Sequence, residues 1–402
     1  MPSTTGALTL RALNRATLDR QLLLRRDPRP AGAAVGHLAG LQAQAPLAPY
    51  VGLWTRLVGF RPEHLSTLLA ERSVVRAHLM RNTVHLVTAP DFVAFRPLFQ
   101  PRITRALSGS FGRRLAGVDL AEIRDSAAAL LTDRALTRPQ LSSELAARWP
   151  DHDPAALAYA ATHLLPLIQV PPRGLWGQTG PAAFTLAASW LAGSAPPQPD
   201  QPDPARPAAA PDQPGPARTA ADLPSPDLAR AAEQVVLRYL AAYGPASVAD
   251  IQAWSGLSRL REVTERLGPR LRPLAGPDGA ELLDLPDAPR PDPGVPAPPR
   301  FLPAYDNLLL SFADRRRVIP HGRPVPLPPG HGATTGTLLI DGHWQAGWKI
   351  SAHPDRPVLD ITLFTPIAAR DEEAIAAEGA RLIEFTAPGA SPDIRFIPVA
   401  DS

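Results

Sequence analysis

The residues best suited to chemistry in this sequence are two glutamines, Gln42 and Gln44, in the stretch HLAGLQAQAPLAPYVGLW. The apolar segment 34–41 predicts a helix before them, and Pro46 disfavours helical geometry at Ala45. Residues two apart face the same side of an extended segment, so we expect both amides to point into one cleft. Two neutral amides can hold a water molecule and stabilise a developing cation without titrating. The alternative is a surface or capping role, although the apolar neighbours favour a buried setting with a purpose.

Nearby polar side chains are candidates to bind a phosphate. His85 lies in the alternating stretch RNTVHLVTA with Asn82, and its side chain is expected on the same face as Thr83. The alternative is a core or edge histidine of a predicted ribbon. His37 lies in the predicted helix and could order Gln44 or cap a loop.

A second polar cluster interrupts the apolar stretch FLPAYDNLLLSFADRRRVI, residues 301–319. Three successive arginines are usually part of a solvated turn, but beside a DNA-binding cleft they would clamp phosphates. The candidate residues of this cluster are Tyr305, Asp306, Asn307, Arg315, Arg316 and Arg317.

Absent residue types and motifs exclude several kinds of chemistry. The chain has no cysteine, which excludes disulfides and thiolate metal sites. No HExxH pair, Walker A loop, dinucleotide fingerprint or nucleophile elbow is present, so we expect neither a metal nor another cofactor. Lys349 is the only lysine, which leaves little for Schiff-base chemistry besides a terminal amine. The function classes that remain are binding without catalysis and catalysis without a metal or cofactor.

The overall charge is nearly balanced. The 402 residues include 41 basic and 38 acidic ones, for a formal net charge of +3, and the basic residues are almost all arginine. Arginine binds phosphate bidentately and keeps its charge, so this composition permits nucleic-acid binding without demonstrating it. The sequence shows neither a membrane-spanning apolar run nor a signal peptide, and we expect a soluble cytoplasmic protein without a membrane partner.

The elements that must position these residues fall into four blocks joined by a linker. Residues 1–118 predict three helices followed by a hairpin, and the same order recurs in 119–192 and 227–290. Residues 193–226 are rich in Pro, Ala, Asp and Gln and predict a linker. The last block, 291–402, has short β-rich runs and one acidic helix, which predict a small barrel or sandwich.

Capping signals are specific in the second block. Thr137 is expected to cap a helix that has Pro139 in its first turn, and Asp153 to cap the next helix. A strand, a Gly-rich turn and a second strand should follow, as in a winged helix.

Five stretches together resemble the bacterial winged-helix DNA glycosylases of the AlkZ/YcaQ type: LNRATLDRQLLLRR, HLAGLQAQAPLAPYVGLWTRL, VVRAHLMRNTVHLVTAPDF, YGPASVADIQAWSGL and FLPAYDNLLLSFADRRRVI. The resemblance covers nearly the whole chain except the linker. It implies an α+β fold, in which three tandem winged-helix (helix-turn-helix) domains and a C-terminal β-barrel form a C-shaped DNA cleft. The family's glutamine–aliphatic–glutamine signature matches Gln42-Ala43-Gln44, and its DNA-contacting hairpin would lie around residues 314–332.

The resemblance implies a monofunctional glycosylase that hydrolyses the N-glycosidic bond of N7-alkylguanine in double-stranded DNA. Bulky antibiotic adducts and interstrand crosslinks would be among its substrates, in DNA repair or self-resistance. Gln44 would hold the water, and Gln42 would orient it or contact the sugar. The protein would act as a monomer at the nucleoid. The residues expected to contact DNA or the lesion are His37, Asn82, His85, Tyr305, Asp306, Asn307, Arg315, Arg316 and Arg317.

A second hypothesis is a winged-helix protein that binds DNA without catalysis, as a regulator or as a resistance protein that sequesters lesions. Winged helices are mostly transcriptional readers, so the fold alone favours this hypothesis. A regulator has no need of paired amides in an apolar cleft, however, and commonly dimerises on palindromic sites. A nuclease is disfavoured because the chain lacks the carboxylate cluster that would hold its metal ions.

Overall fold

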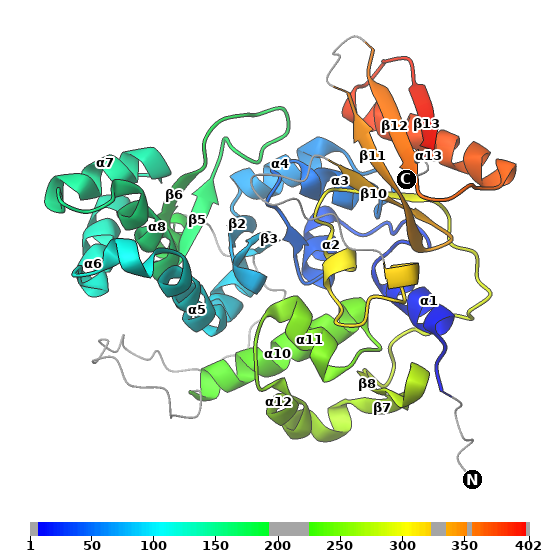
Figure 1. Cartoon of the computed structure of the whole chain (residues 1–402), viewed down its shortest axis with the longest axis horizontal. Coiled ribbons are helices and arrows are strands. Elements are labelled where there is room, and N and C mark those ends of the chain that lie inside the picture. The colour runs from blue at the N-terminus through cyan, green and yellow to red at the C-terminus, as the bar shows by residue number, and fades with distance from the viewer. Residues whose placement is uncertain (1–6, 193–224, 323–334, 352–355, 399–402) are drawn as a thin grey trace, which may run out of the picture.

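The computed structural model of the chain describes residues 7–192, 225–322, 335–351 and 356–398. Figure 1 shows the second block at the left, the third at the bottom and the last at the upper right, around the first block. Helices and strands are mixed, as the predicted α+β class requires. Nearly all of the predicted linker and the far part of the predicted hairpin, residues 323–332, lie outside the described residues.

The first block carries both glutamines. Its elements are α1 (Leu10–Arg20), α2 (Ala31–His37), β1 (Leu41–Gln42), α3 (Ala48–Trp54), α4 (Pro62–Ala70), β2 (Val74–His78), β3 (Val84–Thr88) and α5 (Ala89–Phe111). The helix predicted over 34–41 is wrong at its C-terminal end. Ala39 and Gly40 have φ angles of +54° and +94°, which end the helix and start β1. Gln42 therefore lies on a strand.

The hairpin predicted after α4 is confirmed. β2 and β3 pair antiparallel, with Ala77 opposite His85. A 3₁₀ turn, η1 (Met80–Asn82), connects them, and both Arg81 and Asn82 are in the left-handed region. β1 pairs with the outer side of β3 and places Gln42 opposite His85.

The second block has the helix caps that the sequence predicts. Thr137 accepts a hydrogen bond from the backbone N–H of Gln140, and Asp153 caps the next helix in the same way. The elements of this block are α6 (Leu120–Leu131), β4 (Leu136–Thr137), α7 (Arg138–Arg148), α8 (Pro154–Leu164), β5 (Leu167–Val170), β6 (Ala183–Leu186) and α9 (Ala187–Ala192).

One sheet runs through the first two blocks in the order β1-β3-β2-β5-β6-β4. The two halves meet where β2 pairs with β5, through Arg76 opposite Gln169 and Ala77 opposite Ile168. The second block keeps a hydrophobic core of its own, which includes Leu157. The two blocks are also joined by apolar packing, because Ile168 and Val170 of β5 lie in the same hydrophobic cluster as Val75 and Ala77 of β2.

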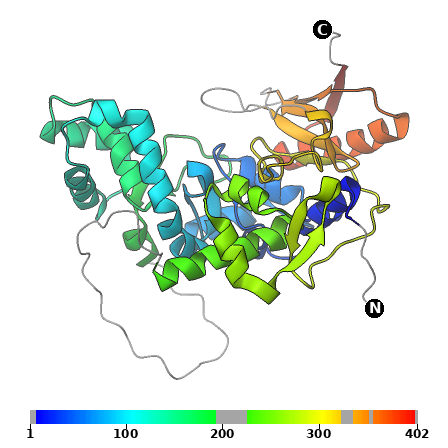
Figure 2. The ribbon, with the colours of Figure 1, turned by 60° about the horizontal axis from the view of Figure 1, so that its bottom comes forward.

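The third block comprises α10 (Pro226–Tyr243), α11 (Val248–Ser255), α12 (Leu260–Leu267) and the hairpin of β7 (Arg272–Ala275) and β8 (Glu281–Asp284). α10 packs against α1 and α5, and Figure 2 shows this block in front of the first one. Helices precede a hairpin in each of the first three blocks. That each block is a separate winged helix with the predicted boundaries stays a prediction.

The barrel expected at the C-terminal end is not closed in the described residues. The last block forms an open sheet in the order β13-β12-β11-β10-β9. β12 and β13 run parallel, which requires a long crossover, and α13 supplies it. The elements are β9 (Arg300–Leu302), β10 (Gly336–Ile340), β11 (His343–Ile350), β12 (Val358–Leu363), α13 (Ala369–Thr386) and β13 (Asp393–Pro398).

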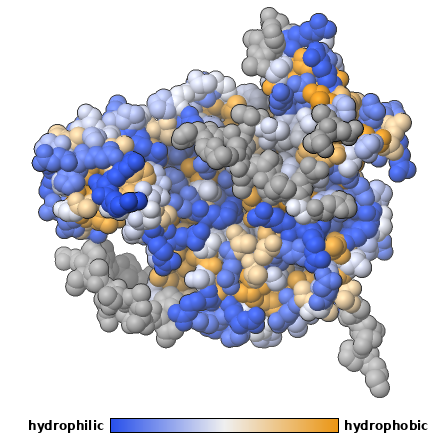
Figure 3. All heavy atoms as spheres, in the orientation of Figure 1, coloured by the Kyte–Doolittle hydropathy of each residue, from blue (hydrophilic) through white to orange (hydrophobic). Residues whose placement is uncertain are grey.

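The surface offers little continuous apolar area on the face shown in Figure 3. Hydrophilic residues predominate there, including over α6, α7 and α8 at the left, and hydrophobic residues form small groups between them. None of the helices in the described ranges combines the length and apolarity that crossing a membrane requires. This face suits a hydrophilic partner.

Candidate active site

Arg81 holds the side chain of Gln42 in one orientation. Gln42 is only 6% exposed, and its Oε1 accepts a hydrogen bond from Nη2 of Arg81 at 2.9 Å. A guanidinium can only donate, so the amide end facing Arg81 must be the oxygen. The NH₂ group of Gln42 therefore faces away from Arg81 and is presented as a donor.

Arg81 is itself fixed by two other segments of the chain. Its Nη1 donates to the Trp254 carbonyl of the third block at 2.5 Å, and its Nη2 also donates to Oδ1 of Asn307 at 3.0 Å. Asn307 in turn donates to the Gly40 carbonyl at 3.2 Å. Burial lowers the pKa of Arg81 to about 10, so the guanidinium stays charged at neutral pH. The hairpin, the third block and Asn307 thus converge on Gln42.

His85 is a core residue in this structure. It is fully buried, and its Nδ1 lies 3.0 Å from the Thr83 carbonyl, so Nδ1 carries the proton. Burial, aided by the nearby charge of Arg81, lowers the pKa of His85 to about 3. The imidazole is neutral at neutral pH, and the structure favours the core alternative over a direct phosphate contact.

Gln44 lies at the wall of a cavity between the first two blocks. The cavity measures about 850 Å³. Its wall includes Gln44, Asn82, Tyr305, Arg76, Arg138 and Arg173. Gln44 is exposed, whereas Gln42 is buried beside Arg81 and is not part of this wall. The two amides are neighbours in sequence, but they do not both open into this cavity.

Arg76 supports the residue between the two glutamines. Its Nη2 donates to the Ala43 carbonyl at 2.9 Å, and its Nη1 donates to the Arg173 carbonyl at 3.3 Å. Ala43 also donates its N–H to the Val84 carbonyl at 2.8 Å. Burial lowers the pKa of Arg76 to about 10. The short motif is therefore anchored from both sides of its central residue.

The wall of the cavity is cationic and aromatic. Arg138 is the first residue of α7, and its guanidinium lies 5.7 Å from the ring centres of both Tyr159 and Phe184. Burial lowers the pKa of His78 to about 3 and that of His163 to about 4, so both imidazoles are neutral at neutral pH. No carboxylate is among the described residues that line this cavity.

Asn82 and Tyr305, both predicted from the sequence, do reach this cavity. Both have left-handed backbones, with φ angles of +58° and +63°. The Asn82 amide lies 3.4 Å from Nε2 of His163. The structure therefore brings Gln44, Asn82 and Tyr305 together on one wall, from three separate segments.

Two residues expected to contact DNA are buried in ion pairs instead. The carboxylate of Asp306 accepts two hydrogen bonds from the guanidinium group of Arg56, from Nη1 at 2.9 Å and from Nη2 at 3.0 Å. Arg317 is 3% exposed, lies 3.6 Å from Asp250 and donates to the Pro245 carbonyl at 2.6 Å. Both side chains stabilise the fold, because their charges are satisfied inside the protein.

The remaining predicted residues lie elsewhere. Arg315 and Arg316 are exposed, and Arg316 pairs with Asp314 at 2.8 Å and with Asp278 at 2.9 Å. His37 places Nε2 2.7 Å from the Arg20 carbonyl at the end of α1, which is a capping contact. The capping alternative considered for His37 fits this position.

Comparison with known proteins now bears on this arrangement. The chain matches the family described as "DNA glycosylase AlkZ-like" over residues 35–385, which is most of its length. The chain belongs to this family. An interstrand DNA cross-link repair glycosylase of Streptomyces sahachiroi is 26% identical over 283 residues, covering 67% of this chain and 64% of that protein. The chain thus matches slightly less than two thirds of the length of this relative.

The fold of the AlkZ-like family extends over the whole chain. The solved structure of the Streptomyces sahachiroi DNA glycosylase AlkZ is similar with a TM-score of 0.70 at 20% sequence identity. The match covers 98% of this chain and all of that one. The likeness at this identity concerns the fold, and it includes the blocks that surround the glutamines.

Several residues of this AlkZ-like site were missed from the sequence. They are four arginines from different elements. Arg81 donates to Gln42, Arg76 donates to Ala43, and the other two, Arg138 and Arg173, line the cavity beside Gln44. Two signals were available: Arg76 interrupts an apolar strand, and Arg81 adjoins Asn82 in a tight turn. Arg138 and Arg173 carry no local signal, since only the pairing of β2 with β5 brings them near.

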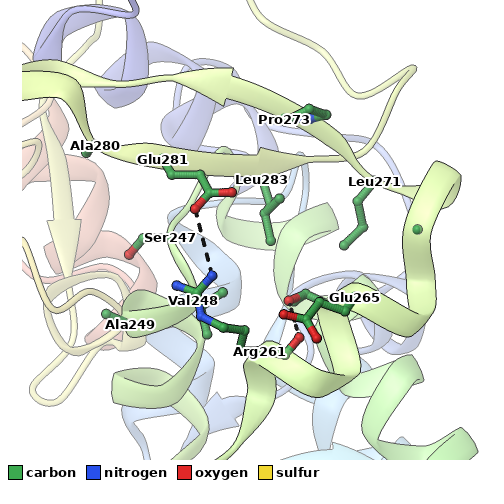
Figure 4. A pocket seen from close by; sticks show the side chains of 12 residues that line it. Ser247, Val248, Ala249, Arg261, Glu265, Leu271, Pro273, Ala280, Glu281 and Leu283 are labelled. Carbon is green, nitrogen blue, oxygen red and sulfur yellow. Dashed lines mark hydrogen bonds and ion pairs between the residues drawn. The ribbon is translucent and has the colours of Figure 1, made fainter.

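A second cavity lies within the third block and differs in character. It measures about 540 Å³ and lies between α11, α12 and the β7–β8 hairpin (Figure 4). Its charges are mixed, because Arg261 lies 3.9 Å from Glu281 and Glu265 is close by. All of its described lining residues belong to the third block and none is a glutamine of the motif, so the cavity beside Gln44 is the better candidate in this AlkZ-like protein.

Proposed function

We propose that the protein is a monofunctional DNA glycosylase that releases N7-alkylguanine from duplex DNA, with bulky adducts and interstrand crosslinks among its substrates. The observation that carries this proposal is the pair of glutamines. Gln42 is oriented by Arg81, and Gln44 lies at an arginine-lined cavity. The cross-link repair function named for the Streptomyces sahachiroi relative supports the choice of substrate.

The chemistry requires little from the protein. Guanine alkylated at N7 carries a positive charge, so the bond from N9 to C1′ breaks with its electron pair going to the base. The sugar becomes an oxocarbenium ion, a water oxygen adds to C1′, and the excess proton passes to solvent. The carbonyl of Gln44 accepts a hydrogen bond from that water, and the Gln42 amide fixes its approach. Neutral amides provide positioning and polarity without acting as acids.

Among the described residues, no amine lies at the cavity beside Gln44 to support a lyase step. Lys349 lies on β11, in the sheet of the last block, is 59% exposed and lies 3.8 Å from Asp360. The product should therefore be an intact abasic site, and the strand should break only after treatment with alkali.

Single-turnover base release tests the proposal directly. The substrates are duplex oligonucleotides with one N7-methylguanine or one nitrogen-mustard crosslink, and the enzymes are wild type, Gln42→Ala and Gln44→Ala. Each variant should lose about a hundredfold in rate, equivalent to ~3 kcal/mol of transition-state stabilisation. Gln345→Ala is the matched control, because Gln345 lies on β11 in the other sheet and should keep the full rate.

The competing hypothesis predicts a different result. A protein that only binds DNA would release no base from either substrate, and its affinity would depend on sequence rather than on the lesion. Tight binding without release by wild type would therefore reject the glycosylase proposal for both substrates. Release that persists in both glutamine variants would move the active site away from this motif.

A further inference from the structure

Arg76 is a buried cation without a counter-ion. It is 2% exposed, and both of its hydrogen bonds go to backbone carbonyls, those of Ala43 and Arg173. Its Nε is buried and has no hydrogen-bond partner. In the described ranges no carboxylate lies within ion-pair distance of this guanidinium, whereas Arg20 and Arg56, equally buried, each pair with an aspartate. Burying an unpaired charge is costly unless a ligand neutralises it.

Two further arginines line the same cavity. Arg138 begins α7, where the helix N-terminus adds a partial positive charge, and Arg173 lies in the loop between β5 and β6. The guanidinium of Arg138 rests over two aromatic rings and has no described carboxylate partner. Three guanidinium groups without an acidic residue in the wall are suited to an anion.

We infer that this cavity is a phosphate subsite, which holds a backbone phosphodiester of the DNA strand that carries the lesion, next to the nucleotide at Gln44. The inference rests on the proposed function in placing that nucleotide at Gln44. An N7-alkylated guanine is cationic and would be repelled by three arginines, so the damaged base lies on the other side of Gln44. The path of the damaged DNA strand follows from this placement: its backbone runs from Gln44 toward the second block.

Binding of the full chain to a duplex with a central tetrahydrofuran abasic analogue tests the inference without any base release. Fluorescence anisotropy over a series of salt concentrations gives the affinity and its salt dependence. Arg138→Gln and Arg173→Gln should each weaken binding roughly tenfold and reduce the slope of log K against log salt by about 0.9, the value of one phosphate contact. Arg148→Gln is the matched control, because Arg148 is exposed at the other end of α7.

Neutral methylphosphonate linkages identify the phosphate. Placed singly on either side of the abasic analogue, one of them should weaken wild-type binding roughly tenfold and have no further effect in Arg138→Gln. If the loss of affinity from the methylphosphonate and the loss from Arg138→Gln add up in full at both linkage positions, the inference is overturned. A salt slope in Arg138→Gln equal to that in Arg148→Gln would also overturn it.

Inorganic phosphate at constant ionic strength distinguishes the source of the anion. A backbone subsite predicts that phosphate competes weakly with the duplex and that this competition is reduced in Arg138→Gln. Phosphate binding that depends on Arg138, combined with no methylphosphonate effect, would indicate a site for free phosphate and would overturn the assignment to DNA. Because none of these readouts uses catalysis, failure of the glycosylase assay and failure of this subsite are separate results.

Discussion

At the scale of single residues, the orientation of Gln42 depends on a hydrogen bond from Arg81. Arg81 fixes which end of the amide is available, and Trp254 and Asn307 fix Arg81. Arg81 is a positioning residue in this arrangement. Its effect should therefore fall on the rate of the chemical step more than on binding.

Arg81→Met should lower the single-turnover rate of base release by about 10- to 100-fold, because the Gln42 amide is then free to rotate. Arg81→Lys retains one donor and should recover part of this loss. The concentration of enzyme that gives half the maximal rate should change much less than the maximal rate in both variants. Equal losses in Met and Lys variants, or a change confined to binding, would contradict a positioning role.

At the scale of elements, the two-residue strand β1 determines where the motif lies. Gly40 has a φ of +94°, and a Cβ atom there would lie 2.7 Å from Cγ1 of Val87 and 3.1 Å from the Leu86 carbonyl. Gly40→Ala should lower the free energy of unfolding by about 1–3 kcal/mol and slow base release. Urea denaturation measures the first effect.

Gly36→Ala provides the control for Gly40→Ala. Gly36 lies within α2, and a Cβ atom there would meet neighbours only at 3.6 Å or more. Alanine favours a helix over glycine by ~1 kcal/mol, so this variant should be neutral or slightly more stable. If both variants lost the same stability, close approach at Gly40 would not be the cause.

Buried histidines should make the junction of the first two blocks sensitive to acid. Burial lowers the pKa values of His78 and His85 to about 3 and that of His163 to about 4, below the unfolded value of 6.5. The unfolded chain therefore takes up protons first, and stability falls as the pH drops below about 6.5. At pH 5.5 each histidine should cost about 1 kcal/mol relative to neutral pH.

Urea unfolding at pH 7.5 and pH 5.5 measures this loss. His163→Gln cannot titrate at this position, so the stability difference between the two pH values should shrink by about 1 kcal/mol in that variant. His152→Gln is the control, because His152 is only partly buried and lies in the turn before α8. An unchanged pH difference in His163→Gln would show that this imidazole is not held neutral.

Prediction from the sequence succeeded where local signals determine the element. The caps at Thr137 and Asp153 and the β2–β3 hairpin depend on neighbouring residues, and they are present. The helix predicted over 34–41 extends too far, into the first residue of β1, because a strand of two residues exists only through its pairing with β3. Local patterns cannot show such pairing, so the Arg81 contact to Gln42 was equally hidden.

Local patterns also misjudged charged residues. Asp306 and Arg317 look like surface groups in the sequence, because their burial depends on distant partners. Asp306 pairs with Arg56, about 250 positions earlier in the chain, and Arg317 pairs with Asp250, about 67 positions earlier. The open sheet of the last block was missed for a related reason. Whether strands close into a barrel depends on their order in space. The sequence shows where strands occur along the chain, but it does not show this order.

At the scale of the whole molecule, buried or partly buried arginine–carboxylate pairs join blocks that are distant in sequence. Arg20 pairs with Asp284 at 2.6 Å, Arg56 with Asp306 at 2.9 Å and Arg26 with Glu378 at 2.6 Å. These pairs link the first block to the third and to the last. Among the described residues, the second block has no buried pair of this kind and is attached by its sheet and apolar contacts.

Asp284→Asn should therefore destabilise the whole protein by about 3–5 kcal/mol, because it leaves Arg20 buried beside a neutral group. Asp125→Asn removes an exposed pair with Arg124, which solvent already screens, and should leave the stability nearly unchanged. Urea denaturation compares the two variants. Similar small losses in both would mean that water reaches the Arg20–Asp284 pair.

The position of Lys349 has a practical consequence. It is the only lysine, and it is exposed on β11, on the far side of the molecule from the second block (Figure 1). An amine-reactive fluorophore would therefore attach at one side-chain position without mutagenesis, besides any reaction at the terminal amine. Because the chain has no thiol, one introduced cysteine in α7 would accept a second dye selectively. Energy transfer between the two dyes would then report how far the second block moves when DNA binds.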